Sequence, residues 1–167
     1  MQKALALAKA LTFALIALPA TGHEFKVGEI TVGHPFAHPT ANMAMAGAGY
    51  LTLTNSGDTA DRLIAVEAAF PRVMLHGSVK TDGVARMIHL DNGVELLPGQ
   101  TVEFAPGGLH VMFMGLDGDP FVEGETIPAT LVFENAGRLE VVFNVEPMKS
   151  GMDMNHDHAG HSMGSGS

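Results

Sequence analysis

Residues 73–114 read VMLHGSVKTDGVARMIHLDNGVELLPGQTVEFAPGGLHVMFM, and this stretch decides the expected fold. Short apolar segments in it alternate with turn signals at Asp91-Asn92-Gly93, Pro98-Gly99 and Pro106-Gly107-Gly108. Turns at intervals of about eight to twelve residues are typical of an all-β sandwich or barrel. The Asn-Gly turn at 91–93 also predicts a hairpin.

The same pattern continues on both sides of this stretch, and no helical period is visible beyond the first 22 residues. The expected strands are Glu29–Val32, Tyr50–Thr54, Arg62–Val66, Val73–His76, Val84–Leu90, Val94–Leu97, Thr101–Phe104, His110–Met114, Thr126–Phe133 and Arg138–Val145. Two prolines make 34–40 an expected loop or irregular edge, and 42–49 is expected to be weak helix or loop. Pro128 predicts a late start or an edge position for its strand.

Composition limits the possible functions. A chain of 167 residues with 46% apolar and 16% charged residues is expected to form one globular domain. The net charge of -9 argues against nucleic acid and anionic membranes as partners. The absence of Cys excludes a disulfide scaffold and a thiol nucleophile. Because no motif of paired carboxylates or Ser, His and Asp is present, we do not expect an enzyme.

The N-terminus predicts export. Lys3 and Lys9 precede a short apolar run, which ends in small residues near Gly22. This is the pattern of a cleaved signal peptide, and the run is too short to span a membrane. We expect a signal peptide at 1–22, a periplasmic domain at 23–147 and no stable membrane insertion. Cleavage would place His23 at the new amino terminus, where it could help to chelate Cu(II).

A set of His and Met residues stands out in the predicted strands. The candidate metal ligands are His76, Met87, His110 and Met112. Imidazole and thioether without thiolate form a soft, neutral donor set that suits Cu(I). Residues two apart on a strand share a face, so His110 and Met112 should point the same way. We expect these ligands to lie on an exposed surface and not in the core.

Several neighbours are alternatives to members of this set. Met74, His89 and Met114 each lie on the expected face of a candidate ligand, and His89 ranks lowest because it is expected to be exposed. His34 and His38 flank prolines and are expected to have no metal role. A thiolate ligand is absent, which argues against an electron-transfer blue-copper protein. The donor set instead favours carriage and release of copper.

Residues 148–167 are predicted to form a disordered tail. This tail is rich in His and Met, a composition typical of metal binding, and it can suit Cu(I) or Cu(II). Its candidate ligands are Met148, Met152, Met154, His156, His158, His161 and Met163. The alternative is a solvated tail without a metal.

Together these motifs resemble the PCuAC periplasmic copper chaperones. The resemblance rests on the pattern His-x10-Met-x21-His-x-Met, on Gly49–Asn55, and on Pro106–Leu116, which reads PGGLHVMFMGL. It covers about residues 28–145. The gap at 88–109 is one residue longer than in this pattern, and we place the extra residue in the turn at 91–93.

The resemblance implies a cupredoxin-like Greek-key β-sandwich and Cu(I) bound by His76, Met87, His110 and Met112. It also implies delivery of copper to cytochrome c oxidase assembly, at the CuA site of subunit II or through an intermediary thiol protein. The tail would bind copper too. The alternative function is a periplasmic copper buffer or resistance protein without a dedicated acceptor.

Overall fold

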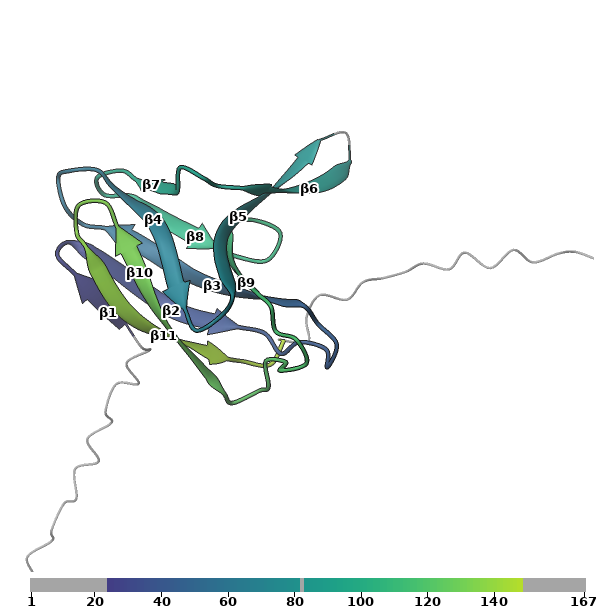
Figure 1. Ribbon diagram of the computed structural model, residues 1–167. Helices are drawn as coiled ribbons and strands as arrows, with labels where there is room; N and C mark the ends of the chain where they lie inside the picture. The colour runs from purple at the N-terminus through teal and green to yellow at the C-terminus, as the bar shows by residue number, and fades with distance from the viewer. Residues whose placement is uncertain (1–23, 82, 149–167) are drawn as a thin grey trace, which may run out of the picture.

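The computed structural model describes residues 24–81 and 83–148 (Figure 1). The strands are β1 (Glu24–Val27), β2 (Ile30–Ala37), β3 (Ala46–Asn55), β4 (Asp61–Ala68), β5 (Arg72–Thr81), β6 (Val84–His89), β7 (Val94–Leu96), β8 (Thr101–Phe104), β9 (His110–Met114), β10 (Thr126–Phe133) and β11 (Arg138–Val145). The described part of the chain is therefore all-β, as predicted, and none of it forms an apolar helix long enough to cross a membrane. The predicted signal peptide and nearly all of the tail lie outside the described residues.

The strands form one hydrogen-bonded network that folds over on itself as a sandwich. Its order is β6-β5-β9-β3-β2-β11-β10-β4-β7, with β1 on β2 and β8 on β3. Neighbours are antiparallel except for β2 and β11. Side chains from β3, β8 and β9 join side chains from β4, β10 and β11 in one buried cluster. In Figure 1 the β5–β6 hairpin extends away from this body.

Two predicted irregular segments are partly strand: 34–37 belong to β2 and 46–49 to β3, whereas 38–45 lie outside the strands as expected. Strand β2 continues through Pro35 to Ala37, and the break in its pairing with β3 falls between Gly33 and Phe36. This bulge accommodates the proline, which has no N–H to donate. Strand β3 begins at Ala46, where it pairs with Met114 of β9, and aromatic rings occupy the space where a Cβ at Gly47 or Gly49 would lie. Glycine there reflects close packing and not flexibility.

The predicted hairpin at 91–93 is also wrong, although the turn itself forms. The Gly93 N–H donates to the Leu90 carbonyl at 2.9 Å, but β6 pairs with β5 while β7 pairs with β4. The backbone of β4 explains this separation, since a Cβ at Gly93 would lie 2.2 Å from the Leu63 oxygen. The turn therefore sends the chain from the projecting hairpin back to the body.

Pro128 lies in an inner strand, at a position where the side toward β4 is not yet paired. Strand β10 starts at Thr126 and runs between β11 and β4, so neither a late start nor an edge strand describes it. Its pairing with β4, however, begins only at Ala129. At Pro128 the cross-strand partner is Val142 of β11, so the missing N–H costs no ladder bond on the β4 side. The predicted hairpin of β10 and β11 is confirmed.

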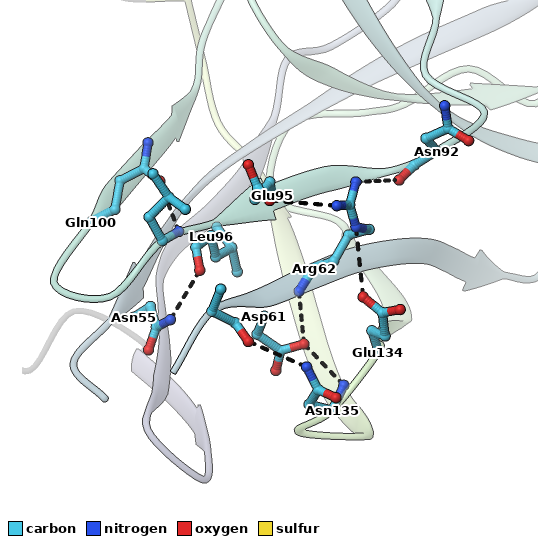
Figure 2. Close-up of polar contacts among 11 residues, drawn as sticks. Asn55, Asp61, Arg62, Asn92, Glu95, Leu96, Gln100, Glu134 and Asn135 are labelled. Carbon is cyan, nitrogen blue, oxygen red and sulfur yellow. Dashed lines mark hydrogen bonds and ion pairs between the residues drawn. The ribbon is translucent and has the colours of Figure 1, made fainter. Parts of the chain in front are cut away.

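A buried carboxylate joins the start of β4 to the turn between β10 and β11 (Figure 2). Asp61 Oδ1 accepts from the backbone N–H groups of Arg62 at 2.7 Å and Asn135 at 2.9 Å, and Oδ2 accepts from Ala136 N–H at 2.9 Å. Asp61 is 7% exposed. Replacing this side chain leaves several backbone donors without an acceptor.

We therefore expect Asp61→Ala to lower the free energy of unfolding by roughly 3 kcal/mol, because bonds to a charged acceptor are lost and buried donors are left unpaired. The decrease is to be measured as a shift of the urea midpoint. Asp58→Ala, at an exposed position, is the control and should leave the midpoint unchanged. Equal midpoints for Asp61→Ala and the parent would contradict this assignment.

Candidate metal centre

Strand register brings three imidazoles into one row. His76 of β5 is the direct partner of His89 on β6 and of His110 on β9. The ring centroids of His76 and His89 are 5.4 Å apart, and those of His76 and His110 are 5.7 Å apart. Both pairs of rings are close to perpendicular. Residues far apart in the sequence therefore meet across three adjacent strands.

Methionines occupy the next positions on the same face. Met74 lies directly opposite Met112, and Met114 lies opposite Arg72. On the other side of β9, Met112 and Met114 face Ala48 and Ala46 of β3. The opposite face of these strands carries the core residues, and this is why polar and thioether groups alternate with apolar ones along β5 and β9. The small alanines do not extend over the methionines.

Hydrogen bonds leave some of the imidazole nitrogens free for a metal. His110 Nδ1 lies 3.2 Å from the Gly108 carbonyl and can donate to it, which leaves Nε2 as the electron-pair donor. His76 Nδ1 is buried and has no hydrogen-bond partner among the described residues. A buried nitrogen without a partner is costly unless something else satisfies it. A metal ion would do so.

Burial and the neighbouring imidazoles disfavour the protonated form of His76. Burial lowers the pKa of His76, and repulsion from His110 and His89 lowers that pKa further. A neutral imidazole is the form that binds a metal. Strands β5, β6 and β9 contain no Asp or Glu and so supply nitrogen and sulfur donors, while the Asp91 carboxylate, in the turn after β6, is paired with His89. These soft donors favour Cu(I) over Mg²⁺, Ca²⁺ or Mn²⁺.

The structure places all four predicted ligands on the same face of β5, β6 and β9, with Met87 and Met112 as diagonal neighbours of His76 on its two sides. His76, His110 and Met112 lie in adjacent positions of β5 and β9. Met87 lies opposite Ser78 on β6, nearer the hairpin tip, and is 63% exposed. The expectation that all ligands are exposed is wrong for His110, the first residue of β9, which is 6% exposed.

The histidines that were ranked low have other contacts. His89 Nε2 lies 3.0 Å from Asp91 Oδ1 in an exposed pair. His34 Nε2 lies 3.2 Å from Glu146 Oε2, and His38 Nδ1 lies 3.1 Å from the Glu146 carbonyl oxygen. Among residues 24–81 and 83–148, no group of three His, Asp or Glu side chains is arranged to hold a metal. A metal centre on the β5–β9 face therefore requires thioethers.

Of the tail candidates, Met148 is described and is 70% exposed. The other tail candidates and His23 lie outside the described residues. Strand periodicity alone does not predict that Met74 lies opposite Met112. A signal for it exists, because Met-Leu-His at 74–76 is the reverse of His-Val-Met at 110–112, and antiparallel strands place such segments like against like.

Solved structures with this fold define the class of domain. The chain is similar to the apo PCuAC domain from PmoF1, with 30% identity, a TM-score of 0.63, and coverage of 75% of this chain and 99% of that chain. It is also similar to the copper-bound PCuAC domain from PmoF2, with 31% identity, a TM-score of 0.63, and coverage of 75% and 98%. CuI-DR1885 from Deinococcus radiodurans shares the fold at 23% identity and a TM-score of 0.55, over 76% of this chain and 83% of that chain. The fold is thus that of a PCuAC-type domain.

Sequence comparison assigns the chain to a protein family. Residues 30–145 match the family described as "Putative lipoprotein LpqE-like", and the chain belongs to this family. It is 33% identical over 111 residues to "Putative lipoprotein Lxx21020" of Leifsonia xyli subsp. xyli (strain CTCB07). This match covers 66% of the chain and 65% of that relative, so the chain matches less than two thirds of the relative's length.

Proposed function

We propose that this protein is a periplasmic copper chaperone that binds Cu(I) and delivers it to cytochrome c oxidase assembly. The observation that carries the proposal is the His76–His110 pair, with its buried unpartnered nitrogen and its flanking thioethers. The copper-bound PCuAC domain from PmoF2 supports copper as the cargo. The family description as lipoproteins supports export to the cell envelope.

The proposed ligands are His76, Met87, His110 and Met112. Two neutral imidazoles and two thioethers leave the positive charge of Cu(I) uncompensated, and this favours loading with a monovalent ion over a divalent one. Met87 projects on the hairpin, where a ligand of an acceptor protein can approach it. Transfer then needs only ligand exchange, with no change of oxidation state and no role as an enzyme.

The His/Met-rich tail is proposed to supply a second, looser copper site. Its imidazoles and carboxylates suit Cu(II), and its thioethers suit Cu(I). The acceptor is proposed to be subunit II of the oxidase at its CuA site, or an assembly thiol protein that loads this site. Thiolates bind Cu(I) more strongly than thioethers, so transfer to such an acceptor is downhill.

A strain that lacks this protein should lose most of its cytochrome c oxidase activity in copper-limited medium, because the CuA site is not loaded. Added copper should restore the activity by mass action. The control is the same strain expressing the parent protein, with respiratory dehydrogenase activity as a second reference. Unchanged oxidase activity combined with copper-sensitive growth would instead identify a copper buffer or resistance protein, and would overturn the delivery function.

A further inference from the structure

Strand β6 is an outer edge of the sheet, on the hairpin that projects from the body (Figure 1). Among the described strands it pairs only with β5. The Leu90 N–H donates to the Leu75 carbonyl at 2.9 Å, and hydrogen-bonded pairs recur every second residue along an antiparallel ladder. The backbone N–H and C=O groups of Ala85, Met87 and His89 therefore point away from β5, to the open edge.

The two faces of β6 carry different side chains. Met87 and His89 lie on the face of the proposed copper site. Because successive side chains alternate, Val84, Arg86 and Ile88 lie on the other face. Val84 is 56% exposed and Ile88 is 42% exposed. An open strand edge with exposed apolar side chains is a template for pairing with a strand of another protein.

This hairpin is basic in an acidic chain. Residues 72–90 contain one acid, Asp82, and three cations, which are Arg72, Lys80 and Arg86. The next acid, Asp91, lies 3.0 Å from His89 Nε2. The whole chain has a net charge of -9. Two copies of β6 paired edge to edge would bring their cations together, whereas a strand that carries carboxylates would be attracted to this edge.

We propose that the copper acceptor adds an acidic edge strand to β6, so that its receiving ligand lies opposite Met87. This inference rests on the proposed function, because it assumes that Met87 binds Cu(I) and that the ion passes to another protein. The added residue that pairs with Met87 points to the same face, with its Cβ about 4.5–5.5 Å from that of Met87.

A thiolate or thioether at this position of the acceptor is within reach of the ion. The bond from copper to the acceptor's sulfur forms as the bond to the Met87 sulfur breaks. Copper stays Cu(I), so no electron moves, and a thiolate or thioether has no proton to lose. Strand pairing thus supplies both the recognition and the alignment of the two sulfur atoms.

The test follows Cu(I) transfer from the full chain to the reduced, copper-free soluble domain of oxidase subunit II. Arg86→Glu reverses the charge of the edge, and Ala85→Pro removes an outward N–H that has no bond to β5. Lys26→Glu, at an exposed position on β1, is the matched control because it changes the net charge equally. Cu(I) affinity and the rate of copper loss to a small chelator are measured for each variant, since both depend on the metal site alone.

We expect Arg86→Glu to slow transfer to the domain by about tenfold or more, the scale of electrostatic effects on association. Ala85→Pro should slow transfer as well. Affinity and loss to the chelator should match the parent in both variants. When the parent is mixed with the domain, the amide hydrogens of Met87 and His89 should exchange more slowly than in the free chain, because the added strand then accepts their hydrogen bonds.

Parent-like transfer by both variants, or equal slowing by Lys26→Glu, would overturn docking at β6 and leave the proposed copper site intact. Slow exchange of the Met87 and His89 amides in concentrated solutions of the chain alone would identify a second copy as the occupant, and would overturn the inference too. A parent chain that binds Cu(I) but never loads the domain would overturn the delivery function, and this inference with it.

Discussion

Replacing His76 with alanine is expected to weaken Cu(I) binding by more than about 100-fold, beyond the effect of losing a supporting group. His76 is in the middle strand of the three that form the face, and it has the buried nitrogen without a partner. His89 cannot substitute for it easily, because His89 Nε2 is paired with Asp91. The affinity is to be measured anaerobically by competition with a Cu(I) chelator.

The same variant should fold as well as the parent when no copper is present. Removing His76 takes away an unsatisfied buried nitrogen, so the lost packing is partly offset. His34→Ala is the matched control, since His34 is exposed and contacts Glu146 on another part of the surface. We expect it to bind Cu(I) like the parent. Parent-like affinity in His76→Ala would show that copper binds elsewhere.

Turn chemistry made most of the strands predictable from the sequence. The strands from β8 to β11 begin and end close to the predicted residues, because Gly, Pro and Asn mark the turns between them. The remaining strand boundaries depend on contacts between segments that are far apart in the sequence. Strand β3 extends back through Gly47 because it pairs there with β9, and rings from distant segments leave room only for glycine, which no local pattern reveals.

The residue types of the candidate site were predictable, but its register was not. Alternation places His110 and Met112 on one face, yet it does not say which residue of β5 lies opposite either of them. That pairing depends on how β9 inserts between β5 and β3. The reversed segments Met-Leu-His and His-Val-Met become informative only once β5 and β9 are known to be antiparallel neighbours. Pairing also places Met87 on the same face, as a diagonal neighbour of His76 on β6.

Phe113→Ala is expected to lower the free energy of unfolding by about 3–5 kcal/mol, the usual cost of removing a buried phenylalanine ring. Phe113 is 0% exposed, and its ring lies 5.2–5.8 Å from those of Phe70, Phe121 and Phe143. Thermal unfolding should show a Tm lower by roughly 10–15 °C. Phe36→Ala, on a half-buried outer position, is the control and should cost only about 1 kcal/mol.

The Phe113→Ala variant also tests whether copper binding depends on the packing of the core. Phe113 points to the core, whereas its neighbours Met112 and Met114 lie on the opposite face of β9. If β9 keeps its place between β5 and β3, the variant should still bind Cu(I). Saturating copper at about 100 times Kd should then stabilise the variant by about 2.7 kcal/mol, as it does the parent. A destabilised variant that gains nothing from copper would mean that the Phe113 ring is needed to hold the strand register that assembles the ligands.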